Sequence, residues 1–269
     1  MHRPADLPDF ATPPLDEVVL GVQFTPAPGF STVHVREVWD LFRAEFPKVQ
    51  DQPPLPPSFE TFGGVPSQQF GFPPLFMGGA SGVGRVWFIS PSENHLLQFQ
   101  PDRLLANWRK APNEQPYPRF ESIATAYAKS LEQIESLFQE RFGHSLQVNQ
   151  AEIAYINIIK VESFAEAENL FKIWKNVSKD FEGVNITLVD VIYNAERQPY
   201  ARLLQEIQSA CSPDGKQKAY RLTLTFRGKP AGASRDDAFK FLTEGREVIV
   251  RRFADLTTRF AHELWGIQG

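Results

Sequence analysis

The chain has 269 residues, of which 42% are hydrophobic and 22% charged, as in ordinary folded globular proteins. Its formal net charge of −4 argues against an electrostatic grip on nucleic acid by the whole surface, although a local basic face is compatible with it. No apolar run approaches the roughly 18 residues of a membrane span. The single cysteine, Cys211, cannot form an internal disulfide. We therefore expect a cytoplasmic protein that does not enter the membrane.

The first half of the chain predicts strands and helices that alternate. The elements expected are a strand at 17–24, a helix that Ser31 or Thr32 caps and Pro47 closes, strands at 85–90 and 95–100, and a long helix from Phe120 to Phe142 that Gly143 ends. The apolar positions of the long helix fall at steps of three or four, which predicts that one of its faces is buried.

Residues 51–84 interrupt this pattern with seven Pro, seven Gly and five Phe and almost no charge. Such a composition cannot sustain a helix, yet the phenylalanines are unlike a plain flexible linker. One interpretation is a long surface connection whose Phe side chains tuck onto the sheet or the helices. The other is a mobile flap or a partner-binding loop, because loops of this length are uncommon without a role.

The second half begins with the most strand-like run in the chain, at 151–161. Apolar residues on both of its faces predict a strand that lies centrally in a sheet and is buried on both sides. Further expected elements are a short helix behind a capping box at 163–166, strands at 185–196, 201–211 and 219–228, and a last helix from Ser234 to Trp265, in whose apolar stripe Arg246 fills the gap after Leu242. Strand 201–211 also has helix potential.

The order of elements predicts an α+β fold. Two tandem strand-helix-strands-helix units, at 1–147 with the 51–84 loop and at 148–269, would form a largely antiparallel, curved sheet. The two long helices would then pack on one face, and the two units would make one continuous domain. The other face of the sheet would be open, concave and available to a ligand.

No pattern for catalysis, metal binding or cofactor binding stands out. The five histidines are scattered, with neither an HxxxH nor a CxxC arrangement, and neither GxxxxGK[ST] nor GxSxG occurs. A lone cysteine such as Cys211 is usually a small buried hydrophobe. We therefore expect neither a metal nor a cofactor, and the enzyme question stays open with a preference for a protein that is not an enzyme.

The candidate ligand- or partner-binding residues are the most suggestive set of polar and aromatic side chains in the sequence: Gln98, Gln100, Asn107, Trp108 and Arg109, together with Asn157. Gln98 and Gln100 share one strand face, which suits hydrogen bonding to a ligand, and Trp108 with Arg109 offers a ring and a bidentate donor. The alternative is a polar solvent face with Trp108 in the core. For Asn157 the alternative is a buried amide that bonds to backbone groups where the two halves meet.

Several stretches together resemble a family of sporadically distributed prokaryotic proteins of unknown function. The residues that carry the resemblance are PPLDEVVLGVQF at 13–24, LLQFQPDRLLANWRK at 96–110, YPRFESI at 117–123, AYINII at 154–159 and FADLTTRFAHELWG at 253–266. The resemblance implies a cytoplasmic prokaryotic setting, and the patchy distribution of the family hints at mobile or defence-linked genes. It brings no catalytic residues with it.

Three functions compete at this point. The first is a non-enzymatic binding protein that uses the open sheet face and the 51–84 loop to hold a protein partner or a second copy of itself. The second is a nucleic-acid-binding protein, because a duplicated strand-helix saddle resembles the TATA-binding fold in architecture. The third is an enzyme with a dispersed active site. Nucleic acid is possible but not favoured, because the acidic balance counts against it.

Overall fold

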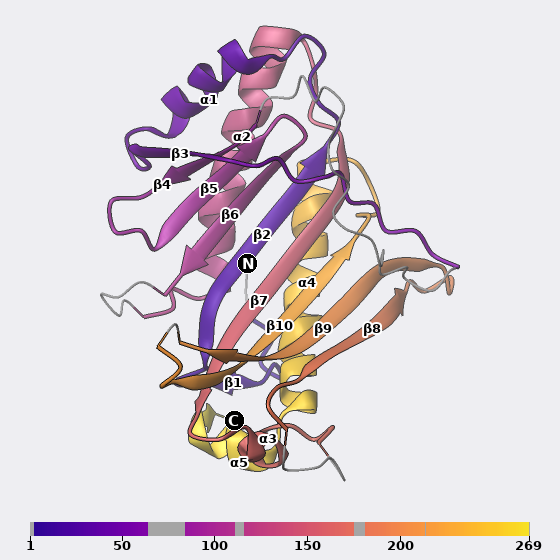
Figure 1. The fold of residues 1–269 in the computed structure, drawn as a ribbon. Helices are drawn as coiled ribbons and strands as arrows, with labels where there is room; N and C mark the ends of the chain where they lie inside the picture. Colours follow the sequence, from indigo (N-terminus) through magenta and orange to yellow (C-terminus); the bar gives the residue numbers. More distant parts are fainter. Residues whose placement is uncertain (1–2, 64–83, 111–115, 175–180, 213, 269) are drawn as a thin grey trace.

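The structure is a computed structural model that describes residues 3–63, 84–110, 116–174, 181–212 and 214–268 (Figure 1). Its strands are β1 (Asp9–Phe10), β2 (Leu15–Phe24), β3 (Lys48–Gln52), β4 (Arg85–Ile89), β5 (His95–Gln100), β6 (Arg103–Arg109), β7 (Val148–Val161), β8 (Asn185–Tyr193), β9 (Pro199–Cys211), β10 (Lys218–Gly228) and β11 (Ile267–Gln268). Its α-helices are α1 (Val35–Phe42), α2 (Phe120–Phe142), α3 (Ala167–Leu170), α4 (Arg235–Leu256) and α5 (Arg259–Leu264).

Among the described residues, nine strands form one sheet in the order β3-β4-β5-β6-β2-β7-β10-β9-β8. Every neighbouring pair in it is antiparallel. A second, two-stranded sheet pairs β1 with β11, so that the two ends of the described chain lie together. The prediction of an α+β fold with a large antiparallel sheet is confirmed.

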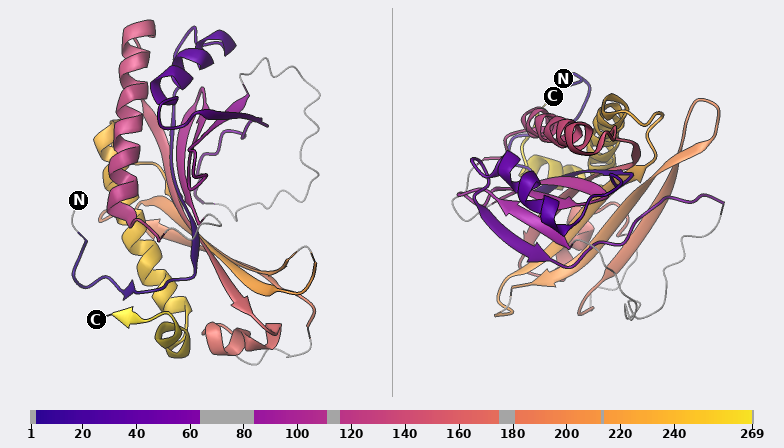
Figure 2. Two further views of the ribbon diagram at one scale, coloured as in Figure 1. Left: turned by 90° about the vertical axis from the view of Figure 1, so that its left-hand side faces the viewer. Right: turned by 90° about the horizontal axis from the view of Figure 1, so that it is seen from above.

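The two long helices, α2 and α4, lie side by side on one face of the sheet (Figure 2). The sheet is curved, and among the residues that the structure describes no helix lies over its opposite face. The core fills the space between sheet and helices and is rich in phenylalanine: Phe24, Phe88, Phe99, Phe138 and Phe226 are fully buried. We call the side without helices the open face.

Strand β7 lies at the centre of the sheet, as its sequence predicts, between β2 and β10. Ile153 and Ile159 point towards the helices and are buried. Ala154, Ile156 and Ile158 point to the open face and are only half-buried, so the expectation of burial on both sides is wrong. The physical reason is that, within the described part of the chain, no helix covers the open face at this point.

Two strands of the nine-stranded sheet escape the sequence patterns. β3 is a short edge strand whose residues are mostly polar and exposed, so it has no apolar alternation to reveal it. In β6, Leu105 lies on the same face as the polar residues Arg103, Asn107 and Arg109, so the run Leu104–Leu105 breaks the period of two. The strands expected at 17–24, 85–90, 95–100, 151–161, 185–196, 201–211 and 219–228 are present.

The last helix is two helices, α4 and α5, and not the single helix that the apolar stripe predicts. The chain becomes extended at Thr257 and pairs there with Phe171. The Thr258 side chain then caps α5 by accepting a hydrogen bond from the Ala261 N–H. The predicted apolar stripe does not continue across the break, because its last positions, Phe260 and Leu264, are exposed, and α5 buries Ala261 instead.

The expected helix ends are confirmed at three places. Ser163 and Glu166 form the capping box before α3. Ser234 caps α4 by accepting from the Asp237 N–H. Gly143 ends α2 with a positive φ of 59°, which glycine adopts without strain. Of the 51–84 loop, residues 64–83 lie outside the described part of the chain, and residues 53–63 have no regular secondary structure.

Candidate functional site

A segment of the predicted loop crosses the open face of the sheet, and we call residues 53–62 the strap. It leaves β3 at one edge of the sheet and passes β2 and β7 towards β9 (Figure 1). Side chains from six strands, β2, β4, β5, β6, β9 and β10, hold it, and most of them bond to its main chain. This arrangement is the opposite of a β-ladder, in which main chain pairs with main chain.

The Gln100 amide makes the clearest of these contacts, because it bonds to both main-chain groups of Leu55. Its Oε1 accepts from the Leu55 N–H at 2.9 Å, and its Nε2 donates to the Leu55 carbonyl at 3.0 Å. Single contacts of the same kind join Gln23 to the Ser58 N–H, Arg103 to the Pro56 carbonyl and Arg202 to the Thr61 carbonyl. The open face thus binds the strap mainly through the main-chain groups of the strap, and these contacts depend little on the side chains of the strap.

Glu60 is the exception, because the sheet binds its side chain. The carboxylate is 5% exposed and pairs with Arg202 on β9 and with Arg227 on β10, the latter at 2.6 Å. The Arg202 guanidinium also lies over the Phe62 ring, 4.9 Å from its centre. Glu152 lies 4.0 Å from Arg227, and burial raises the pKa of the Glu152 carboxyl. A buried charge of this kind is costly unless it is paired, so these pairs fix the position of the strap.

The predicted candidates Gln98, Asn107 and Arg109 also point to the open face, beyond the strap. Gln98 donates to Asn107 Oδ1 at 2.7 Å and accepts from Trp87 Nε1 at 2.9 Å. Asn107 donates to Glu17 at 2.6 Å, and the Arg109 guanidinium lies 5.9 Å from the centre of the Trp87 ring. Both amides are therefore bonded within the protein, and only Arg109 of the three is half-exposed.

Trp108 points the other way, towards the helices. It is 2% exposed, and its ring packs 5.1 Å from that of Tyr117. The structure therefore places Trp108 in the core, as the alternative interpretation of the sequence has it, where its ring cannot contact a partner at the open face. The alternation of a strand explains this, because neighbours such as Trp108 and Arg109 face opposite sides.

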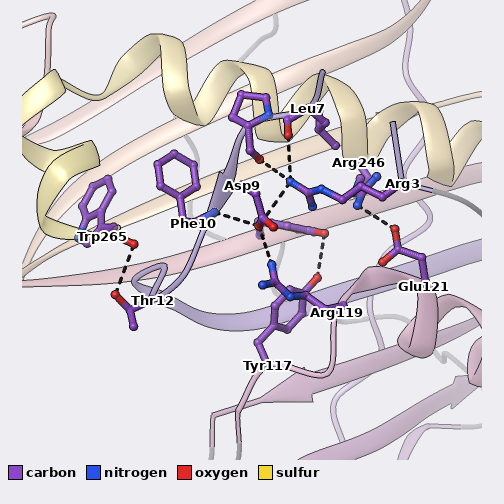
Figure 3. A network of polar contacts seen from close by, with 12 residues as sticks. Arg3, Leu7, Asp9, Phe10, Thr12, Tyr117, Arg119, Glu121, Arg246 and Trp265 are labelled. Atoms are coloured by element: carbon purple, nitrogen blue, oxygen red, sulfur yellow. Dashed lines mark hydrogen bonds and ion pairs between the residues drawn. The ribbon is translucent and has the colours of Figure 1, made fainter. Parts of the chain in front are cut away.

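A cavity lies on the helix side of the sheet, enclosed by β7, α4, the start of α2 and the N-terminal segment (Figure 3). We call it the helix-side cavity. Its lining residues include Arg3, Asp9, Phe10, Tyr117, Arg119, Phe120, Tyr155, Asn157, Arg246 and Phe253. Only Asn157 among these was a candidate from the sequence.

Arg246 is the central polar residue of the cavity. It comes from the middle of α4 and is 3% exposed, and its Nη2 donates to Glu121 Oε1 at 2.9 Å. Its positive charge acts on the Tyr155 hydroxyl, which lies 3.1 Å from that of Tyr117. Burial raises the pKa of both tyrosines, so their hydroxyls stay protonated and able to donate.

Gly245 allows α4 to pack closely against the sheet, and this close approach brings Arg246 into the cavity. A Cβ at this position would lie 2.6 Å from Cδ1 of Phe226 and 2.7 Å from Cγ2 of Ile153, closer than side chains pack. Glycine costs about 1 kcal/mol relative to alanine in a helix interior. Its presence here allows α4 to lie directly on β7 and β10, and the next residue then reaches the cavity.

Asn157 donates through Nδ2 to the Leu222 carbonyl at 3.2 Å and is 3% exposed. It lies where β2 and β10 flank β7, opposite Leu15 on one side and Leu222 on the other. Asn157 is therefore a buried amide that bonds to the backbone, as the alternative interpretation of the sequence has it. Its side chain also lines the helix-side cavity.

The N-terminal segment closes the mouth of the cavity (Figure 3). The Asp9 carboxylate accepts hydrogen bonds from the Arg119 side chain at 2.7 Å and from the main-chain N–H of Phe10 at 2.9 Å. It also lies 3.5 Å from the Arg3 guanidinium. Arg119 has φ 71° and ψ 154°, a backbone conformation that is strained for any residue except glycine. The fold thus holds Arg119 at the mouth of the cavity in spite of the strain in its backbone.

Reactive groups do not gather elsewhere in the described part of the chain. Among the described residues, no group of three or more His, Cys, Asp or Glu side chains could hold a metal ion. Cys211 is exposed at the end of β9, and the expectation of a buried cysteine is wrong, because the strand ends beyond the covering helices. No helix within the described ranges is long and apolar enough to cross a membrane.

Sequence reasoning missed Glu60, Arg119 and the two tyrosines of the cavity. Glu60 is the only charged residue in the strap, a signal that could have marked it. Arg246 carried a signal, because it fills a buried position in an apolar stripe. Comparison of the chain with models of protein families gives no match, and comparison with curated proteins gives none either.

Proposed function

We propose that this protein is a non-enzymatic binding protein that holds an extended segment of a partner protein on the open face of its sheet. The observation that carries the proposal is the pair of hydrogen bonds between the Gln100 amide and the main chain of Leu55. A surface that bonds to backbone groups accepts many sequences in extended form. In this proposal the strap is an intramolecular ligand that occupies the binding site of the partner segment.

The chemistry of the strap indicates which partner segment would fit. Four of its ten residues are proline, and proline-rich segments are already extended, so they lose little entropy on binding. Its one charged residue, Glu60, is buried between two arginines. We therefore expect a partner segment that is extended, rich in proline, and carries one acidic residue at the position of Glu60.

The test uses a fluorescein-labelled peptide with the sequence of residues 52–63 and the full chain, followed by fluorescence anisotropy. In the wild type the strap competes at an effective concentration on the order of millimolar, so the peptide should bind weakly. Glu60→Ala in the protein removes the charged anchor of its own strap and leaves both arginines for the peptide. The variant should therefore bind the peptide at least roughly tenfold more tightly than the wild type does.

Two controls separate this from non-specific binding. A peptide with alanine at the position of Glu60 should bind neither protein, and adding Arg227→Ala to the variant should abolish the gain. Arg259→Ala, which changes an arginine that is 92% exposed on α5, should leave the gain intact. Equal binding of both peptides, or no gain in the variant, would refute the proposal.

We further propose that residues 1–147 and 148–269 are two units of similar design within one domain. The strand order supports this, because β6, β5 and β4 follow β2 on one side while β10, β9 and β8 follow β7 on the other. Each set of strands precedes a long helix. Membership of the prokaryotic family that the sequence resembles would fit the same proposal and adds no activity to it.

The same strand order makes nucleic-acid binding the second candidate, since a saddle of two such units resembles the TATA-binding fold. Two observations weigh against it. The strap crosses the open face, and Arg202 and Arg227 are already paired with Glu60. A mobility shift of duplex DNA that weakens steeply with salt would favour this candidate, and no shift at low salt would remove it.

A further inference from the structure

The helix-side cavity is separate from the open face, and the function proposed above does not use it. The space in it that water-sized molecules could occupy is about 60 Å³, and the cavity opens to solvent at its mouth. Its body is apolar, with side chains from the sheet, α2, α4 and the N-terminal segment: Phe10, Leu15, Phe120, Leu224, Ile249 and Phe253. Small-molecule sites combine such an apolar body with a few polar groups that fix the orientation of the ligand.

The charged side chains that line the cavity are cations with one exception. Three arginines line it, Arg3, Arg119 and Arg246, against a single carboxylate, that of Asp9. The hydroxyls of Tyr117 and Tyr155 bond to each other, so together they offer one further neutral donor, and the Asn157 side chain adds an amide. The lining therefore carries an excess of positive charge, and it favours an anionic ligand with an apolar body.

The protein's own carboxylates already mark the positions that an anion would take. Asp9 is held by Arg119 at 2.7 Å and lies 3.5 Å from Arg3, and Glu121 is held by Arg246 at 2.9 Å. An arginine fork matches the two oxygens of a carboxylate. A doubly charged phosphate would be repelled by these two acidic neighbours, whereas a single carboxylate replaces one of them without excess charge.

The strain at Arg119 is the second, independent sign of a ligand site. Backbone conformations such as its φ 71°, ψ 154° are strained and concentrate at ligand clamps and switches. An exposed arginine whose only task was its pair with Asp9 would contribute less stability than this strain costs. The strained position is accounted for if Arg119 also binds a ligand.

We propose that the helix-side cavity binds a small organic carboxylate, whose apolar body lies against Phe120 and Phe253 and whose carboxylate takes the place of Asp9 between Arg119 and Arg3. The N-terminal segment is then a lid, and Asp9 is its internal competitor. Binding requires that Asp9 leave Arg119, so the lid shifts when the ligand enters.

The experiment is isothermal titration calorimetry of the full chain with benzoate, and with benzamide as its uncharged counterpart. Benzoate should bind and benzamide should bind at least roughly tenfold more weakly, because it lacks the charge that the arginines pair. Asp9→Asn removes the competitor and should tighten benzoate binding several-fold. Arg119→Gln changes a side chain that is 46% exposed and lies outside the core, and it should weaken benzoate binding roughly tenfold.

Opposite effects of two substitutions in one ion pair distinguish a ligand site from a structural contact. If the pair were only structural, both variants would lower the melting temperature and change benzoate binding in the same direction, which would overturn the proposal. Equal binding of benzoate and benzamide, or no binding of benzoate to the Asp9→Asn variant, would overturn it as well. Tyr117→Phe should weaken binding and provides a second variant, while Arg259→Gln should leave it unchanged.

Discussion

Gly245→Ala is expected to destabilise the protein, although alanine is the better helix former. The new Cβ would lie 2.6 Å from Cδ1 of Phe226 and 2.7 Å from Cγ2 of Ile153. These two side chains come from neighbouring strands, β10 and β7, and both are fully buried. Neither can retreat, because the strands are hydrogen-bonded on both sides and the core behind them is filled.

The magnitude follows from two opposing effects. Alanine in place of glycine stabilises a helix interior by about 1 kcal/mol. An extra methyl group in a well-packed core costs about 1–3 kcal/mol, and contacts with two strands place Gly245 in the upper part of that range. The net loss should be about 1–2 kcal/mol, which lowers the melting temperature by roughly 2–8 °C for a chain of this size.

Thermal and urea unfolding followed by circular dichroism measure this effect directly. Lys240→Ala on the same helix is the matched control, because this side chain is 80% exposed and its loss should change stability by less than about 0.5 kcal/mol. The Gly245→Ala variant should also bind benzoate more weakly, since α4 must move away and carries Arg246 with it. A variant as stable as the wild type, or more stable, would refute the close approach of α4 to the sheet.

Two further predictions separate neighbouring residues and test burial. Trp108→Ala should lower the free energy of unfolding by about 3–5 kcal/mol, because Trp108 is buried in the core. Arg109→Ala should change it by less than about 0.5 kcal/mol, because Arg109 faces the open side. Urea unfolding measures both, and similar losses in the two variants would contradict the opposite orientations of these side chains. Burial raises the pKa of Glu152 above its ordinary 4.5, so the folded protein binds this proton more tightly than the unfolded chain does. The free energy of unfolding should then fall as the pH rises from about 4.5 through the higher pKa of the folded state. The Glu152→Gln variant should lose this pH dependence. If wild type and variant differed in stability by the same amount at about pH 4 and at about pH 7, the raised pKa of Glu152 would be contradicted.

Local sequence patterns determined most of the secondary structure of this protein. Apolar alternation located the central strand β7, and helical periodicity located α2 and α4, because each pattern directly reflects burial of one face. The capping residues Ser163 and Ser234 marked the beginnings of two helical segments for an equally local reason. Where burial does not follow a simple period, as in β3 and β6, the patterns carried no signal.

The sites depended on contacts between residues far apart in the chain, which no local pattern encodes. Glu60 meets Arg202 and Arg227 only because the strap crosses the sheet, and Asp9 meets Arg119 only because the N-terminal segment folds back over α2. The sequence by itself determined which faces of strands and helices are apolar, since a side chain's hydrophobicity is its own property. The tertiary structure alone decided which charges meet, since pairing depends on distances that folding sets.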